Sequence, residues 1–363
     1  MKHLRRIMAL SLSLSMVFSA TVFAVEDEPA DIEPVVEEAT VEEIPVEEIP
    51  VEEVIEEITS GEIESYSLDE AAVESDTIDA EQDIEELRPN ETSRRTAIAN
   101  LQAYVNVPYD GNDENTLAVR QAAIDVISGQ PVKYTQANQV AALVQLGYSS
   151  QTLNGPITIT KGTLRYRDWF WWKTKDVYLV SCSGTDTNVQ NQTTDWWTDL
   201  LVGFEQDNQY ARNIKGAILA SIPAGSNIIV TGHSLGGMVA QQISADKEIK
   251  NSYNVLNTVT FGSPLIEGFA REGMVKRLGD TSDIVPYASV STLYNIVWQA
   301  TGLNREDGGY SVWDLNFSAH RFSYQRASVW GAYDPCGEKN TGRELTLDFS
   351  TTRFFKSPVT VTE

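Results

Sequence analysis

One stretch constrains the fold of this chain more than any other. Residues 227–242 read N-I-I-V-T-G-H-S-L-G-G-M-V-A-Q-Q. The β-branched run at the start is typical of a buried strand, and the residues after the glycines continue as a helix. Gly232, Ser234 and Gly236 fill the pattern G-x-S-x-G at the junction. The sequence therefore predicts a tight strand-to-helix turn with a serine at its apex.

The apex serine has two interpretations. A hydroxyl on such a turn can act as a nucleophile, because the N–H groups of the new helix face the space where an oxyanion would form. Alternatively, Ser234 only caps the helix of a glycine-rich turn. We favour the nucleophile, because the strand, the helix and the additional Gly237 all fit the motif.

A serine nucleophile needs a base, and the chain has three histidines. His3 lies in the N-terminal segment, and the side chain of His233 is expected to project away from the neighbouring serine. His320 remains as the candidate base. It follows Ser234 in the chain, as this type of motif requires. The alternative is a structural histidine.

The base in turn needs a carboxylate that holds its tautomer. Five aspartates are candidates: Asp246, Asp280, Asp283, Asp307 and Asp314. We favour Asp283, because it follows a strand-like run, at the sheet edge where active sites of such folds gather. Asp280 is the second choice, and Asp246 is expected to point away from the site. Asp283 as an ordinary loop or cap residue stays open.

The oxyanion donors are predicted from two segments. The run Y-L-V-S-C-S-G-T-D-T at 178–187 ends a second buried strand. Gly184 would permit a bend there, and Thr185 could supply both its N–H and its hydroxyl. Leu235, the residue after the serine, would supply the other N–H.

The periodicity of the remaining chain predicts alternating strands and helices. Helices are expected at 96–105, 117–127, 137–146 and 208–221, and strands at 157–166, 176–182, 255–261, 275–279 and 344–349. This alternation indicates an α/β fold, with a central, mostly parallel sheet and helices on both faces.

The N-terminus has the features of an export signal. Residues 1–24 combine a basic start, an apolar middle and the small-residue end V-F-A. We predict a signal peptide cleaved after about Ala24 and hence a secreted protein; an uncleaved membrane anchor is the alternative. No further run of about 18 apolar residues occurs, so no second membrane span is expected.

Residues 25–91 form an acidic, low-complexity segment. Residues 26–91 hold 27 Asp and Glu against the single Arg88, so they account for the net charge of −25. We predict a disordered spacer or pro-segment; binding to a cationic partner is the alternative. Nucleic acid is not expected as a partner, because the acidic residues would repel phosphates and no basic patch compensates. A folded domain is expected over 92–363, a length that suits one large domain.

Two smaller features remain open. Cys182 and Cys336 could form a disulfide or be buried free thiols. The aromatic run W-F-W-W at 169–172 is expected to be a β-hairpin with alternate aromatics buried, with a membrane-facing patch as the alternative. The few histidines and cysteines give no metal-ligand spacing, so neither a metal nor a cofactor is expected.

Together these motifs resemble the class 3 (fungal-type) triacylglycerol lipase family of the α/β-hydrolase superfamily. The resemblance covers roughly 150–325 and is carried by five features. They are G-H-S-L-G-G at the turn, S-G-T-D-T at 183–187, D-W-W-T-D-L at 195–200, D-I-V-P at 283–286, and the late His320. Ser183 stands where the family commonly has arginine, which leaves the substrate class in doubt.

The resemblance implies an α/β-hydrolase fold and a site. Ser234 would be the nucleophile, Asp283 the acid, His320 the base, and Thr185 and Leu235 the oxyanion donors. A lid would span about 187–199, where Trp196 and Trp197 either contact acyl chains or pack on the core.

The implied function is that of a secreted serine ester hydrolase of lipid degradation. It would be a lipase that acts on acylglycerols or related lipid esters and contacts a lipid interface transiently. A phospholipase, a short-chain esterase or a polymer esterase are alternatives on the same fold. A catalytically silent binding module is the alternative from another class.

Overall fold

The computed structural model describes residues 90–109, 111–184, 209–266, 271–287, 302–311 and 317–357. The predicted signal and almost all of the acidic segment lie outside these ranges. Thr185, Trp196 and Trp197 also lie outside the described residues. The boundary predicted at residue 92 therefore stays a prediction.

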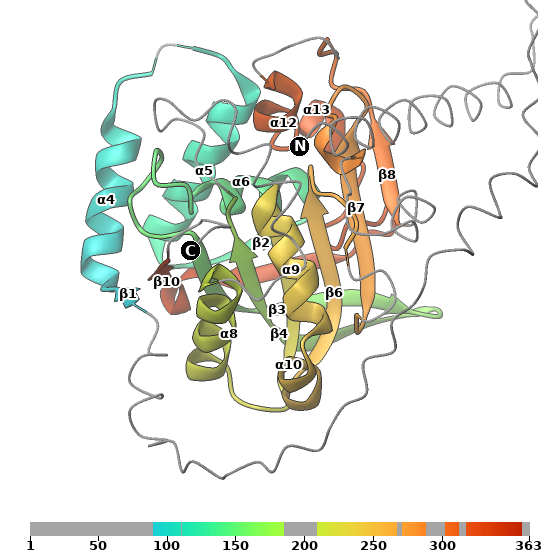
Figure 1. Ribbon diagram of the computed structural model, residues 1–363. Helices are drawn as coiled ribbons and strands as arrows, with labels where there is room; N and C mark the ends of the chain where they lie inside the picture. The colour runs from blue at the N-terminus through green and yellow to red at the C-terminus, as the bar shows by residue number, and fades with distance from the viewer. Residues whose placement is uncertain are drawn as a thin grey trace, which may run out of the picture. The chain divides into compact units, whose positions relative to one another are not determined.

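A ten-stranded sheet forms the centre of the described fold (Figure 1). Its parallel half runs in the order β4, β5, β6, β7 and β8. These strands are β4 (Trp171–Cys182), β5 (Asn227–His233), β6 (Asn254–Phe261), β7 (Met274–Asp280) and β8 (Leu303–Glu306). Because they are parallel, their carboxyl ends meet at one edge of the sheet.

The other half of the sheet is antiparallel. Strand β3 (Ile157–Asp168) pairs with β4 along their whole length and joins the two halves. Beyond β3 lie β10 (Arg353–Lys356) and the edge strand β1 (Asn90–Thr92), while β9 (Glu344–Asp348) pairs with both β3 and β2 (Pro131–Tyr134).

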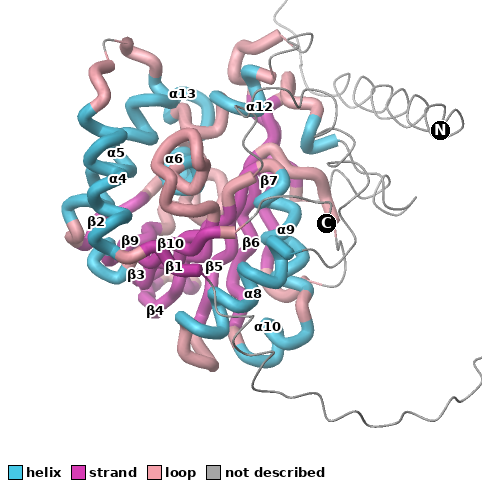
Figure 2. Tube along the Cα trace, turned by 60° about the vertical axis from the view of Figure 1, so that its left-hand side comes forward, coloured by secondary structure: helices cyan, strands magenta, loops and turns pink. Residues whose placement is uncertain are grey.

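Helices cover both faces of the sheet, as Figure 2 shows. One face packs against α4 (Arg94–Asn106), α5 (Glu114–Ser128), α6 (Ala137–Gln145) and α13 (Ala327–Trp330). The other packs against α8 (Gln209–Ser221), α9 (Leu235–Ala245) and α10 (Lys247–Ser252). Alternate side chains of each strand enter opposite cores: in β5, Ile229 joins the first cluster, and Ile228 and Val230 join the second.

The fold confirms the predicted α/β class, including the helices on both faces. Four strands escaped prediction: β1, β2, β8 and β10 have only three or four residues each. Strand β8 reads L-N-R-E, a polar sequence without the apolar alternation of a strand. The short helices α10, α12 (Ser318–Phe322) and α13 also lack a helical period long enough to be recognised.

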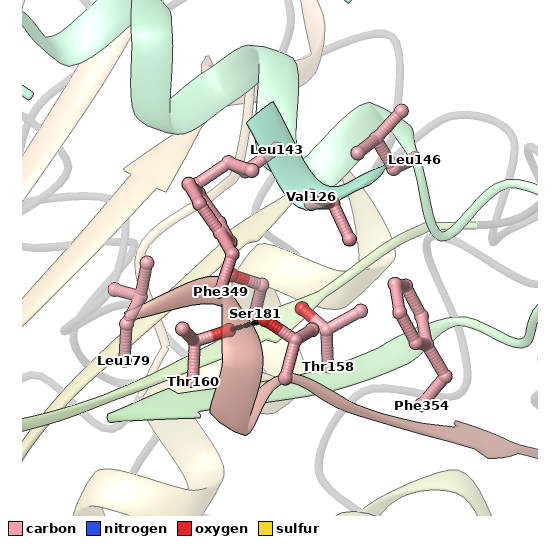
Figure 3. A pocket seen from close by; sticks show the side chains of 10 residues that line it. Val126, Leu143, Leu146, Thr158, Thr160, Leu179, Ser181, Phe349 and Phe354 are labelled. Carbon is pink, nitrogen blue, oxygen red and sulfur yellow. Dashed lines mark hydrogen bonds between the residues drawn. The ribbon is translucent and has the colours of Figure 1, made fainter. Parts of the chain in front are cut away.

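One small space interrupts the packing between helices α5 and α6 and the sheet. It measures about 10 Å³ and is lined by Val126, Leu143, Leu146, Thr158, Thr160, Leu179, Ser181, Phe349, Thr352 and Phe354 (Figure 3). The hydroxyls of Thr160 and Thr352 lie 3.0 Å apart and satisfy each other beside it. A space of this size holds at most one water, so it offers no room for a substrate.

Two open questions from the sequence are settled by the structure. Cys182 and Cys336 are both buried free thiols. The aromatic run does form the tip of a hairpin, β3–β4, but the expected burial of alternate aromatics is wrong. All four side chains are exposed, because β4 pairs with β5 only from Tyr178 onward and the tip extends past the sheet.

Among the residues that the structure describes, no helix is both long enough and apolar enough to cross a membrane.

Candidate active site

Ser234 occupies the predicted turn between β5 and α9. Its backbone has φ 56° and ψ −126°, a conformation that residues other than glycine rarely adopt. Such a backbone costs about 1–3 kcal/mol and persists only where its surroundings enforce it. The Ser234 N–H donates to the carbonyl of Phe261, at 2.9 Å, which fixes the turn against the end of β6.

The glycines of the motif make this turn sterically feasible. A Cβ at Gly232 would lie 2.3 Å from the Gly236 carbonyl oxygen, and one at Gly236 would lie 2.1 Å from the Cys182 carbonyl oxygen. No side chain fits at either position. The Ser234 side chain makes no capping hydrogen bond to α9, which removes the interpretation of this serine as a simple helix cap.

Asp283 and His320 come together in a buried pair. The Nδ1 of His320 lies 2.9 Å from Oδ2 of Asp283, and both side chains are almost fully buried. A carboxylate accepts only, so Nδ1 carries the proton and Nε2 is left with a lone pair. This is the tautomer that a general base requires.

The Asp283 carboxylate is held by further donors. The Val285 N–H donates to Oδ1 at 3.0 Å, and the Tyr324 hydroxyl donates to Oδ2 at 2.6 Å. Asp283 follows β7, and its N–H donates to the carbonyl of Asp280. Tyr324 lies four residues after His320, just past the end of α12, so the same short segment supplies both the histidine and a donor to its partner.

Asp280, the second choice for the acid, has other partners. Its carboxylate accepts from the N–H groups of Ser282 and Gly308 and from the hydroxyl of Ser323. Burial is the main cause that raises the pKa of Asp280, and these hydrogen bonds oppose it. Asp280 therefore organises the loops around Asp283.

His233 also takes part in the site, although no sequence pattern indicated this role. Its ring lies 4.6 Å from the His320 ring, centre to centre. Its Nε2 lies 2.8 Å from the His320 carbonyl oxygen and must donate to it, because a carbonyl only accepts. Its Nδ1 then accepts from the Tyr148 hydroxyl. Burial, and secondarily the charge of His320, lowers the pKa of His233 well below its usual 6.5.

Two glycines bring separate strands close to these side chains. Gly262, at φ +58°, follows β6, and a Cβ there would lie 2.8 Å from Oδ2 of Asp283 and 2.9 Å from Nδ1 of His320. Gly184, after β4, would place a Cβ 2.9 Å from the Cβ of Ser234. The ends of β4 and β6 therefore flank Ser234 and the Asp283–His320 pair, respectively.

The predicted oxyanion donors are placed only in part. Leu235 is buried and is the first residue of α9. The first N–H groups of a helix have no acceptor within the helix, so the Leu235 N–H is available to an oxyanion. Thr185 lies outside the described residues, although its neighbour Gly184 lies against Ser234. The lid candidates Trp196 and Trp197 also lie outside them. Within the described ranges, no three His, Cys, Asp or Glu side chains form a group that could hold a metal ion.

The comparisons with known proteins agree with this architecture. Residues 157–292 match the family model described as Lipase (class 3). The match spans the hairpin β3–β4, the turn with Ser234, and Asp283, and ends before His320. Neither the curated proteins nor the solved structures gave a significant match. Residues 157–292 of this chain are therefore similar to the class 3 lipases, which supports a lipase-like ester hydrolase.

Proposed function

We propose that this protein is a secreted serine ester hydrolase that cleaves lipid esters through Ser234, His320 and Asp283. The observation that carries the proposal is the buried Asp283–His320 hydrogen bond of 2.9 Å, at the same sheet edge as a serine in a strained turn. The bond leaves Nε2 of His320 as the basic atom.

The proposed reaction proceeds in two steps. Oγ of Ser234 attacks the ester carbonyl carbon while Nε2 of His320 takes the hydroxyl proton. The negative charge on the carbonyl oxygen is stabilised by the N–H groups of Leu235 and Thr185, each worth about 3 kcal/mol in such sites. Nε2 then protonates the leaving alcohol, and water, activated by the same nitrogen, releases the acyl group from Ser234. No cofactor is required.

The family match supports a lipid or other ester as substrate. Acylglycerols are the proposed substrates, with Trp196 and Trp197 as candidate contacts to the acyl chain. The N-terminal sequence supports export, with cleavage after about Ala24. Phospholipids, short-chain esters and polymer esters are the competing substrates on the same mechanism.

The test replaces the nucleophile. Ser234→Ala should lower kcat for a p-nitrophenyl ester by about ten-thousand-fold or more, without unfolding the domain, because the remaining site cannot form the acyl-enzyme. Ser226→Ala, at the opposite end of β5, is the matched control and should keep full activity. Hydrolysis unchanged in Ser234→Ala would refute the role of this serine. Esters of rising chain length and one phospholipid would then identify the preferred substrate.

A further inference from the structure

The tip of the β3–β4 hairpin is the most apolar exposed feature among the described residues. Trp169, Phe170, Trp171 and Trp172 are 85%, 77%, 75% and 43% exposed. Four large consecutive aromatics on a surface mark a site of interaction. The hairpin is the green pair of strands that extends beyond the sheet at the right of Figure 1.

The tip is a rigid projection. Strands β3 and β4 are paired without a break up to Asp168 and Trp171. Neighbouring strands end earlier: toward the tip, β9 pairs with β3 no further than Arg165, and β5 pairs with β4 no further than Tyr178. The last turn of the hairpin is therefore held by its own ladder and can enter another medium without breaking the sheet.

Cationic side chains surround the base of the tip. Between residues 165 and 175 there are four basic side chains and one acidic one: Arg165, Arg167, Lys173, Lys175 and Asp168. The Arg165 guanidinium lies 4.1 Å above the Trp172 ring, and the Lys175 ammonium lies 4.6 Å above the Tyr166 ring. Lys173 pairs with Asp168, and Arg165 pairs with Glu344 of β9. Basic side chains therefore still outnumber acidic ones at the tip, although the whole chain carries −25.

The tip lies far from the candidate active site. Strands β4 and β5 are parallel, and Cys182 at the end of β4 pairs with Gly232, just before Ser234. The tip is at the opposite end of the 12-residue β4, about 36 Å away at roughly 3.3 Å per residue. In Figure 1, α12 with His320 lies at the top and the hairpin lies low on the right.

We propose that the hairpin tip inserts into the headgroup region of an anionic phospholipid bilayer and tethers the protein there. Tryptophan prefers this region because its ring is apolar and its N–H is polar. Arginine and lysine a few residues behind the aromatics would meet the lipid phosphates. This tether is distinct from the predicted lid contact, because the tip lies at the end of the sheet opposite Ser234 and acts on no ester.

The arrangement favours a bilayer over a polysaccharide. Trp171 and Trp172 are successive strand residues, so their side chains point to opposite faces of the hairpin. Trp169 and Phe170 form the turn itself. The rings therefore surround a wedge and do not form the single flat platform on which sugar rings stack.

The test is co-sedimentation of the chain, in the form its host exports, with lipid vesicles. One set of vesicles is phosphatidylcholine alone, and in the other about one lipid in three is the anionic phosphatidylglycerol. Three variants are compared with the wild type: Trp169→Ser/Phe170→Ser/Trp171→Ser, Arg167→Gln/Lys173→Gln, and Ser234→Ala. The matched control is Val107→Ser/Leu153→Ser/Met274→Ser, which removes three other exposed apolar side chains. Hydrolysis of a soluble ester and the circular dichroism spectrum show that each hairpin variant is folded.

The proposal predicts binding to the anionic vesicles, with a blue shift of tryptophan emission. The aromatic variant should lose at least tenfold in affinity, and the charge variant about fivefold for each cation removed. The Ser234→Ala variant and the control should bind like the wild type, so failure of the proposed enzyme function would not affect this result. Equal binding by the hairpin variants, no binding by the wild type, or retention on insoluble polysaccharide in place of vesicles would each overturn the proposal.

Discussion

At the scale of the residue, His233 and His320 lie ring against ring in the interior but differ in their bonding. His320 donates from Nδ1 to Asp283, whereas His233 donates from Nε2 to the His320 backbone and accepts from Tyr148. The first is thereby prepared to accept a proton at Nε2. The second has both nitrogens occupied and, with its pKa lowered by burial, stays neutral.

This difference predicts how stability depends on pH. In the unfolded chain His233 binds a proton below about pH 6.5, while in the folded protein it does so only at much lower pH. The unfolded state then binds more protons, so stability falls as the pH drops below 6.5, by about 1.4 kcal/mol per pH unit from this group. The measurement is urea unfolding between pH 7.5 and 5.

The variant His233→Gln should lose this part of the slope. Tyr148→Phe is the control, because it removes the hydrogen bond to Nδ1 but leaves the titrating ring in place. Slopes that are identical in the wild type and His233→Gln would show that the buried ring does not stay neutral.

Some residues of the site could be predicted from the sequence, and others could not, for physical reasons. Asp283 and His320 could be proposed because a strand end and elimination single them out, and the structure places them in one hydrogen bond. His233 was expected to point away from the serine hydroxyl, and no pattern revealed its contact with a residue 87 positions later. Tyr324 was missed because its hydroxyl meets Asp283 across 41 positions of the chain, from a turn that follows α12.

At the scale of the element, the site depends on tight turns at the carboxyl ends of three parallel strands. The turn after β5 carries Ser234, the turn after β6 carries Gly262, and the turn after β7 carries Asp283. The long strands and helices were predictable because their apolar periods are clear. The short α12 was not, because five residues cannot show a helical period.

The turn after β6 can be tested with a matched pair of glycines. Gly262 and Gly225 both have positive φ, but a Cβ at Gly262 meets Asp283 and His320, whereas one at Gly225 meets nothing within 4 Å. Substitution by alanine should cost about 1–2 kcal/mol of backbone strain at either position. Only Gly262→Ala should also displace the Asp283–His320 pair and lower kcat by tenfold or more.

The measurement is kcat on a soluble ester together with the free energy of unfolding for each variant. Equal losses of activity in Gly262→Ala and Gly225→Ala would mean that general strain, and not the close contact with the pair, controls catalysis.

At the scale of the whole molecule, the net charge and the candidate active site belong to different parts of the chain. The segment holds nearly all of the net charge, whereas the described contacts of the site lie between Tyr148 and Tyr324. We therefore expect removal of residues 25–85 to leave kcat and the free energy of unfolding unchanged.

A longer deletion, of residues 25–93, should lower stability by about 2–3 kcal/mol. It removes strand β1, the buried bond from the Thr92 hydroxyl to the Asn154 carbonyl, and the Ser93 cap of α4. Thermal and urea unfolding measure both deletions. Loss of activity in the shorter deletion would show that the acidic segment belongs to the catalytic domain.

The reaction of the chain with a fluorophosphonate probe tests the central claim most directly, because only an activated serine forms the covalent adduct. Intact-mass and peptide analysis should find one adduct per chain, on the peptide that contains Ser234. Labelling should vanish in Ser234→Ala and slow by about a hundredfold or more in His320→Ala. A folded wild-type chain that stays unlabelled, or labelling that persists in Ser234→Ala, would contradict the account.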